Sequence, residues 1–189
     1  STSSSMFHKK TKGDRFMNKK IMYIVTILST AVLLFLDQIV KYLAVLHLKG
    51  QATIPIIKNV FELQYLENQG AAFGIMQGKK TFFVIGTLIF LVIVVILYHN
   101  IPLTKRFTPI RIVAVLIVAG AIGNMIDRVV HQYVIDFFYF KLINFPIFNV
   151  ADIYVVVACI LFILLMLFYY KEEELGQIFP FMKNKKAEE

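Results

Sequence analysis

The sequence has few of the residues that build disulfides or metal sites. Cys159 is its single cysteine, so an intrachain disulfide and a cysteine-based metal site are both excluded. The four histidines are dispersed, without a His-x-x-x-His pair or an HExxH motif. The Gly-x-Ser-x-Gly motif of serine hydrolases is missing, as is a phosphate-cradling loop. We therefore expect no metal and no cofactor.

Apolar residues are abundant and lie in long runs. They make up 58% of the 189 residues, and the mean hydropathy is +0.70, whereas a soluble domain is about 45–50% apolar. Four runs are long enough to span about 30 Å of hydrocarbon as helices. These runs cover residues 21 to about 46, 82–98, about 110–130 and about 148–170. The sequence predicts an all-α membrane protein with four transmembrane helices and no internal repeat.

The segments outside these runs differ in character. Residues 1–16 are polar and aperiodic and precede a natural-looking start at Met17, so we interpret them as a tag or disordered leader. Residues 17–170 form the predicted four-helix membrane domain, and residues 171–189 a cytoplasmic polar tail. In the link 47–81, the stretch 60–65 alternates apolar and polar side chains, which predicts a half-buried strand.

The net charge of +8 points to a membrane rather than to nucleic acid. Thirteen Lys and Arg residues lie at the two termini and in the second link, and five lie in the first and third links. Positive residues concentrate on the cytoplasmic side, so both termini are expected to face the cytoplasm. No helix face is basic and no basic–aromatic interleaving occurs, so we expect no nucleic acid partner.

Polar residues within the spans gather at one level. An ionised side chain at the centre of a spanning helix costs roughly 2.5–3.5 kcal/mol on insertion scales, so such residues tend to be functional. Because helix direction alternates, all of these residues fall near the outer face, and Asp136 in the third link lies at the same level. The polar residues within the spans are Asp37, Gln38, Lys41, Asn124, Asp127, Arg128, Asn149 and Asp152.

Each of these groups has a structural interpretation beside a functional one. Asp37 and Lys41 are four residues apart and can form a local salt bridge or place a substrate head group. Asn149 can be a helix N-cap, and Asp152 a first-turn acid favoured by the helix dipole. Arg128 is most simply an internal charge partner of nearby carboxylates.

The glycines that precede this polar stripe have their own interpretation. Gly120 and Gly123 are expected to let a neighbouring helix approach closely, as small residues do in membranes.

Peptide hydrolysis without a metal or a nucleophilic side chain needs an activated water. Two adjacent carboxyl groups that share one proton can supply it, the ionised one removing a proton from water and the neutral one polarising the scissile carbonyl. Asp152 is the more easily ionised candidate because it opens a helix. Its partner is either Asp127 or Asp136, and spacing does not choose between them.

Five motifs together resemble the lipoprotein signal peptidases, also called signal peptidase II or aspartyl peptidase family A8. They are Asp37-Gln38 with Lys41, NQGAAFG at 68–74, GNMIDR at 123–128, VIDF at 134–137 and FNVAD at 148–152, in the family's order. The resemblance covers about residues 17–170.

The resemblance implies an aspartyl endopeptidase of the bacterial cytoplasmic membrane. Its substrates are prolipoproteins with a diacylglyceryl-modified Cys, cleaved just before that Cys, and it is blocked by globomycin-type inhibitors. It favours Asp136 and Asp152 as the catalytic pair, and implies a β-like extracytoplasmic cradle in the first link. We also expect contact with membrane lipid and a monomer. The supporting residues it implies are Asp37, Lys41, Asn68, Gly120, Asn124, Asp127, Arg128 and Asn149.

Two other classes fit the sequence less well. A proton-coupled transporter would carry charges through the membrane depth and often internal repeats. A non-enzymatic scaffold gives no reason for polar residues of three helices to meet at one level. The motifs and their common depth therefore favour the peptidase.

Overall fold

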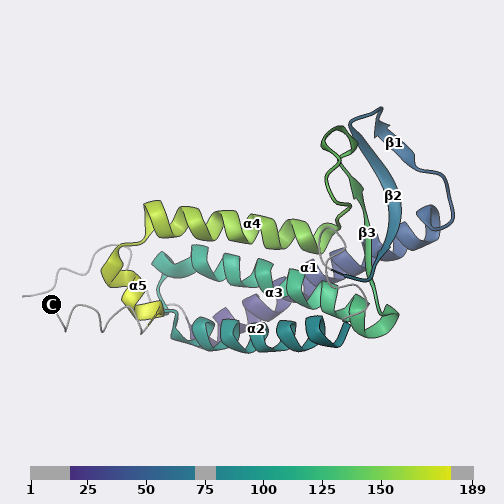
Figure 1. Ribbon diagram of the computed structural model, residues 1–189. Helices are drawn as coiled ribbons and strands as arrows, with labels where there is room; N and C mark the ends of the chain where they lie inside the picture. Colours follow the sequence, from purple (N-terminus) through teal and green to yellow (C-terminus); the bar gives the residue numbers. More distant parts are fainter. Residues whose placement is uncertain (1–17, 71–79, 180–189) are drawn as a thin grey trace, which may run out of the picture.

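The computed structural model describes residues 18–70 and 80–179 of the chain. Long helices dominate it (Figure 1). Within the described residues, four helices are long and apolar enough to cross a membrane, as predicted. They are α1 (Lys19–Leu48), α2 (Lys80–Asn100), α3 (Thr108–His131) and α4 (Val150–Leu164), the last continued by a π-helical turn, η4 (Leu165–Tyr169). The predicted leader 1–16 and residues 71–74 of the second motif lie outside the described residues.

Local sequence signals set the helix ends. The Asn18 side chain accepts hydrogen bonds from two amides of the first turn of α1 and so caps that helix. Pro109 lies in the first turn of α3, where its missing N–H costs nothing. Gln132 ends α3 in the left-handed conformation, with φ of 73°. Asn149 caps α4, which confirms its interpretation as an N-cap.

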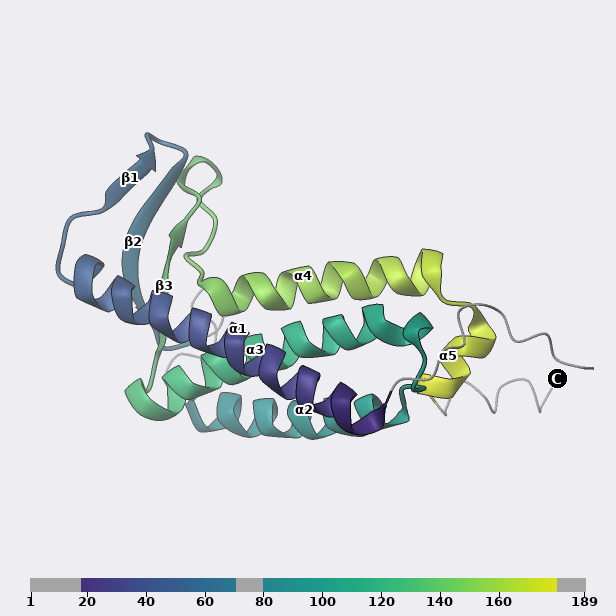
Figure 2. The same ribbon diagram turned by 180° about the vertical axis from the view of Figure 1, so that it is seen from behind.

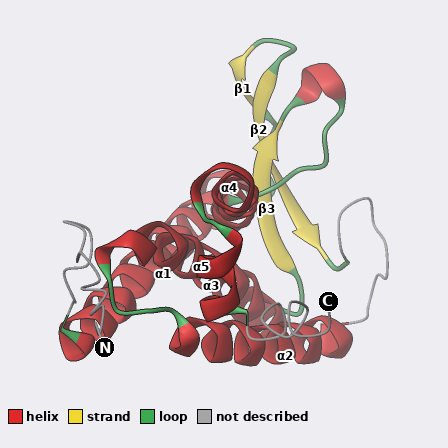
Figure 3. Cartoon of the chain, turned by 90° about the vertical axis from the view of Figure 1, so that its left-hand side faces the viewer, coloured by secondary structure: helices red, strands yellow, loops and turns green. Residues whose placement is uncertain are grey.

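Helix α3 is the central element of the bundle, in contact with α1, α2 and α4. Figure 2 shows α1 crossing α3 on its way to the sheet, and Figures 1 and 3 together show the sheet standing at the end of the bundle where α4 begins. The outward faces carry large exposed apolar side chains such as Phe35, Ile89 and Ile160. Exposed side chains of this kind along every spanning helix suit contact with lipid.

A small antiparallel sheet stands at one end of the bundle, in the strand order β1-β2-β3. Its strands are β1 (Ile54–Ile57), β2 (Phe61–Asn68) and β3 (Val134–Tyr139). The predicted strand at 60–65 and the expected β-like cradle in the first link are thereby confirmed. The third strand was not predicted: it comes from the aromatic link between α3 and α4, where it is followed by the 3-10 turn η3 (Lys141–Ile143).

Buried apolar side chains form one cluster at each end of the described helix bundle. At the sheet end, Ala44 and Leu48 of α1 pack against Ile135 and Phe137 of β3. This contact ties the first helix to the strand that carries Asp136. The cluster at the opposite end joins the helices to the 3-10 turn η2 (Lys105–Phe107) and to α5 (Glu172–Ile178).

The segment expected to be a polar tail therefore begins with a packed helix. Leu175 and Ile178 of α5 are buried, and Glu174 forms an ion pair with Arg106. Residues 180–189 lie outside the described residues.

Candidate active site

Asp136 is a buried carboxyl group in the middle of β3. The pairing of β3 with β2 sets Asp136 opposite Leu66 and Val134 opposite Asn68. Asn68 Nδ2 donates to Asp136 Oδ2 at 2.8 Å, and Asn149 Nδ2 donates to Oδ1 at 2.6 Å. Burial, and then repulsion from Asp152, raise the pKa of Asp136 to about 7. Asp136 therefore stays protonated to a much higher pH than an ordinary carboxyl group.

Asp152 lies in the first turn of α4 and belongs to its capping box. Its backbone N–H donates to Asn149 Oδ1 at 3.0 Å, and the Asn149 N–H donates back to Asp152 Oδ2 at 3.1 Å. The other carboxyl oxygen accepts from Asn124 Nδ2 at 2.8 Å. Asp152 is thus a first-turn acid, as predicted, and its half-buried carboxyl group is held by α3 as well as by its own helix.

Both aspartates line one cavity of about 550 Å³ between the sheet end of the bundle and the loop before α4. Asn68, Asn124 and Arg128 add polar groups to its wall. The rest of the wall is largely apolar, including Phe145, Ile147, Phe148, Val156 and Val157. A cavity lined by two carboxyl groups and a largely apolar wall can hold an apolar peptide next to an acid pair.

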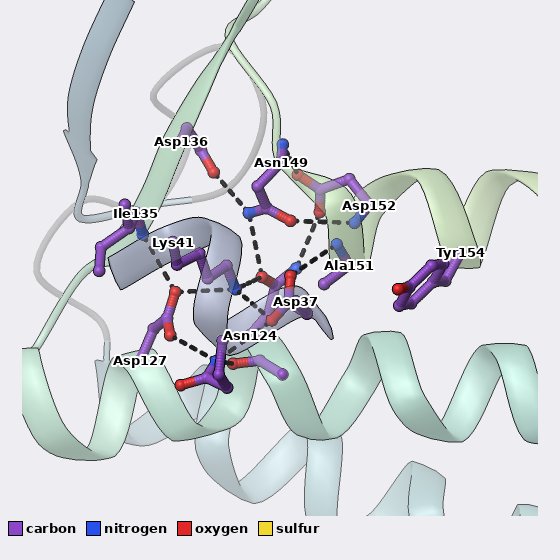
Figure 4. Close-up of polar contacts among 12 residues, drawn as sticks. Asp37, Lys41, Asn124, Asp127, Ile135, Asp136, Asn149, Ala151, Asp152 and Tyr154 are labelled. Atoms are coloured by element: carbon purple, nitrogen blue, oxygen red, sulfur yellow. Dashed lines mark hydrogen bonds and ion pairs between the residues drawn. The ribbon is translucent and has the colours of Figure 1, made fainter. Parts of the chain in front are cut away.

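Beneath this cavity lies a buried ionic network around Lys41 (Figure 4). Lys41 Nζ lies 3.0 Å from Asp37 Oδ2 and 2.9 Å from Asp127 Oδ2, and donates to Asn124 Oδ1 at 3.0 Å. Lys41, Asp37 and Asp127 are each at most 1% exposed. The predicted Asp37–Lys41 salt bridge is confirmed, and it is part of a larger group rather than a local pair.

The two candidate partners of Asp152 have different surroundings. The carboxyl group of Asp127 faces Lys41 and Gln38 and accepts the Ile135 N–H at 3.1 Å. It does not line the cavity that holds Asp136 and Asp152. Its ion-pair partner is Lys41 and not its sequence neighbour Arg128.

Arg128 was expected to be a charge partner of these carboxylates. It forms no direct ion pair with them and acts on Asp127, Asp136 and Asp152 only by electrostatic attraction over a longer distance. Among the described residues, its hydrogen bonds go to the backbone oxygens of Asn124 and Gly70, at 3.4 and 3.3 Å. Its guanidinium group also lies 4.8 Å from the ring centre of Phe83. Arg128 therefore links α3 to α2 and to the end of β2 at the rim of the cavity.

The two glycines of α3 allow the close approach predicted for them. A Cβ atom on Gly120 would lie 2.6 Å from Ala151 O, and one on Gly123 would lie 2.5 Å from Asp37 Oδ2. Real Cβ contacts are almost never that short. The absence of these side chains lets α4 and the carboxyl group of Asp37 lie directly against α3.

Sequence reasoning missed one polar contributor to this network. Gln38 was noted as a membrane-level polar residue but not as a site residue, and its Nε2 donates to both Asp37 Oδ2 and Asp127 Oδ1 at 3.1 Å. Its position next to Asp37, at the same depth as the other polar residues, was the available signal. In the described parts of the chain, no group of three or more His, Cys, Asp or Glu side chains is arranged to hold a metal ion.

Comparison with known proteins supports one family. Residues 29–168 match the family model of signal peptidase (SPase) II. The lipoprotein signal peptidase of Caldanaerobacter subterraneus subsp. tengcongensis is 44% identical over 136 residues, which cover 71% of this chain and 90% of that protein. The lipoprotein signal peptidase of Halothermothrix orenii is 38% identical over 143 residues, which cover 76% of this chain and 92% of that one.

A solved structure agrees with this assignment. A bacterial membrane enzyme determined by the in meso method at 1.9 Å resolution superposes with a TM-score of 0.67 and 31% identity, over 84% of this chain and 98% of that chain. The likeness therefore holds for the fold of most of the chain and not only for its sequence. The chain belongs to the signal peptidase II family and is a multi-pass bacterial membrane peptidase.

Proposed function

We propose that Asp136 and Asp152 are the catalytic pair with which this chain removes the signal peptide from diacylglyceryl-modified prolipoproteins, cleaving just before the lipidated Cys. The observation that carries the proposal is that both carboxyl groups line one cavity and both bond to Asn149. The alternative partner, Asp127, is engaged by Lys41, Gln38 and a backbone amide.

The surroundings of the two carboxyl groups suit different roles. The pKa of Asp136, raised to about 7, keeps this group protonated up to about neutral pH, so it can donate its proton to the scissile carbonyl oxygen. Asp152 accepts two hydrogen bonds at the N-terminus of a helix, which suits a carboxylate that removes a proton from water. The hydroxide attacks the carbonyl carbon while the oxygen takes the Asp136 proton, which gives a diol. The C–N bond then breaks as the proton held by Asp152 passes to the leaving amine, and one diol hydroxyl returns a proton to Asp136. The titration belongs to the pair as a whole.

The apolar part of the cavity wall suits the rest of this substrate. The cavity that holds the acid pair is also lined by Phe145, Ile147, Val156 and Val157. A signal peptide and a diacylglyceryl group are both apolar, so they gain from contact with such a wall. We propose that globomycin-type inhibitors occupy the same cavity, and that membrane lipid enters it along this side.

We also propose the orientation of the chain in the membrane. Six basic residues of the described chain lie toward the end of the bundle away from the sheet: Lys19, Lys20, Lys105, Arg106, Arg111 and Lys171. The positive-inside rule assigns that end, and with it both termini, to the cytoplasm. The sheet and the acid pair then lie near the outer face. Both aspartates belong to one chain, which suits a monomer.

The test is cleavage of a diacylated prolipoprotein by the purified protein, in comparison with Asp136→Asn, Asp152→Asn and Asp127→Asn. We expect the first two substitutions each to lower the cleavage rate on the order of 1000-fold, since each removes a proton-transfer group. Activity near that of the wild type in folded Asp136→Asn protein, together with its loss in Asp127→Asn, would show that Asp127 is the partner of Asp152.

A further inference from the structure

Two buried carboxylates outside the catalytic pair each hold a backbone amide next to it. Asp37 Oδ1, on α1, accepts the N–H of Ala151 at 2.9 Å. Ala151 directly precedes Asp152, so this hydrogen bond fixes the backbone from which one catalytic side chain projects. The same N–H lies in the first turn of α4, where it has no partner within the helix.

Asp127 does the same for the other catalytic residue. Its Oδ2 accepts the N–H of Ile135 at 3.1 Å. Ile135 directly precedes Asp136 in β3, and it is paired to β2 on one side only. The two hydrogen bonds therefore follow the same pattern. In each, the backbone N–H of the residue just before a catalytic aspartate is held by a carboxylate from a helix of the bundle, α1 in one case and α3 in the other.

Lys41 and Gln38 join these two carboxylates. Lys41 Nζ lies within 3.0 Å of an oxygen of each, and Gln38 Nε2 donates to each at 3.1 Å. Lys41 and Gln38 lie three residues apart on α1, so one turn of that helix connects the group that holds α4 to the group that holds β3. Figure 4 shows Asp37, Lys41 and Asp127 between β3 and the start of α4.

We propose that Asp37, Gln38, Lys41 and Asp127 form a positioning clamp that sets the spacing between the two catalytic carboxyl groups. This inference rests on the proposed function, since it takes Asp136 and Asp152 as the catalytic pair. None of these four residues lines the cavity that holds Asp136 and Asp152. They act through the backbone amides that they hold.

The cost of this network supports a positioning role over a purely stabilising one. Lys41 and its two carboxylates are almost completely buried. Replacing a buried ion pair with apolar side chains of similar volume is often neutral or stabilising, so stability alone does not explain such a group. Positioning does, because the shared proton requires the two carboxyl groups at a fixed short separation, and a displacement of about 1 Å can lower a rate on the order of 100-fold.

The experiment measures kcat, KM and the pH profile of kcat for Asp37→Asn, Asp127→Asn and the double variant. Asparagine keeps an oxygen that can accept the backbone N–H but loses the ion pair with Lys41. We expect each single variant to lower kcat about 10- to 100-fold with little change in KM. The double variant is expected to be barely worse than either single one, because both changes open the same clamp.

The pH profile separates positioning from a smaller folded fraction. Carboxyl groups that move apart repel each other less, so the interval between the two apparent pKa values of kcat should narrow. Among the described residues, Lys41 and Arg128 also act on this pair through their charges. Removal of one negative charge alone would shift both apparent values in the same direction, and a partly unfolded sample would shift neither.

Gln38→Met is a milder variant. It removes the hydrogen bonds from the Gln38 side-chain amide to Asp37 and Asp127 and keeps all charges. It is expected to fold even where the Asn variants do not, and to lower kcat several-fold with KM unchanged. The matched control is Lys49→Met with Glu67→Gln, which breaks an exposed ion pair of 2.7 Å that also joins the end of α1 to β2. This control is expected to leave kcat, KM and the pH interval unchanged.

The outcomes separate the clamp from the proposed function. Wild-type kcat and an unchanged pH interval in Gln38→Met and in the folded Asn variants, together with inactive Asp136→Asn and Asp152→Asn, would overturn the clamp alone. Activity retained by Asp136→Asn and Asp152→Asn would overturn the catalytic pair itself. Additive losses in the double Asn variant would show that Asp37 and Asp127 act separately, which also contradicts a clamp.

Discussion

Asn149 Nδ2 donates a hydrogen bond of 2.6 Å to Asp136 Oδ1. The same asparagine side chain accepts the backbone N–H of Asp152 as the N-cap of α4. One fully buried residue therefore bonds both members of the proposed catalytic pair and also begins the helix that carries one of them. Its two roles use different atoms, so they can be separated by substitution.

Asn149→Ser keeps a side-chain oxygen for the helix cap but loses the donor to Asp136, whereas Asn149→Ala loses both. We expect both variants to lower kcat about 10- to 100-fold, because the Asp136 carboxyl group then keeps only the hydrogen bond from Asn68. Only the Ala variant should also lose the cap, which is worth about 1 kcal/mol. Thermal unfolding in detergent, together with the cleavage assay, checks this. Equal stability of the two variants would contradict the capping role.

The raised pKa of Asp136 predicts how stability depends on pH. Between its ordinary value of 3.8 and about 7, the folded chain holds a proton that the unfolded chain has released. Stability from this group is therefore full below about pH 4 and is lost as the pH rises through about 7. The unfolding temperature of the wild type should fall over this range more than that of Asp136→Asn. Identical slopes for the two proteins would show that Asp136 titrates normally.

The raised pKa of Asp136 also predicts how kcat changes at alkaline pH. If neutral Asp136 donates the proton, kcat should fall as the pH rises above about 7, where this carboxyl group ionises. The rate is measured from about pH 5 to 9 with saturating substrate, and the integrity of the protein is checked at each pH. A kcat that stays constant through this range would exclude Asp136 as the proton donor.

The membrane spans could be predicted from sequence because their signal is local. A run of about 20 apolar residues needs no knowledge of its neighbours, and the alternation at 60–65 was enough for β2. Strand β3 was missed because its aromatic residues suit a membrane interface equally well, and its partner lies far away in the chain. Asp136 and Leu66, which face each other in the sheet, are 70 positions apart.

The site was predictable as a set of residues but not as a network. Membrane depth brought Asp37, Lys41, Asp127 and Asp152 to one level, and this needs only helix direction. Which oxygen meets which N–H depends on helix rotation and on the Gly120 contact, and neither is encoded in local spacing. Sequence adjacency suggested Arg128 as the partner of Asp127, whereas packing brings Lys41 of another helix to that carboxylate.

The proposed orientation is testable by thiol labelling of intact cells. In a Cys159→Ala background, which removes the single native cysteine, a new cysteine at exposed Lys58 should react with a membrane-impermeant maleimide from outside. One at exposed Glu173 should react only after the membrane is permeabilised. The reverse pattern would place the sheet and the acid pair on the cytoplasmic side.

The close approach of α3 and α4 predicts different effects at two helical glycines. A Cβ atom on Gly120 would lie 2.6 Å from Ala151 O and 2.7 Å from Val155 Cγ2, whereas one on Gly86 of α2 would meet no other part of the described chain within 4 Å. Gly120→Ala must push α4 away, so we expect a loss of about 1–3 kcal/mol of stability.

We expect kcat to fall as well in Gly120→Ala, because Ala151 precedes Asp152 and the displacement moves the acid pair. Gly86→Ala meets no obstacle and gains helix propensity of up to about 1 kcal/mol, so it should be at least as stable as the wild type and equally active. Unfolding temperature and cleavage rate are measured for both variants in the same detergent. If Gly120→Ala matched Gly86→Ala in both, the backbone contact between α3 and α4 would not be what holds Asp152 in place.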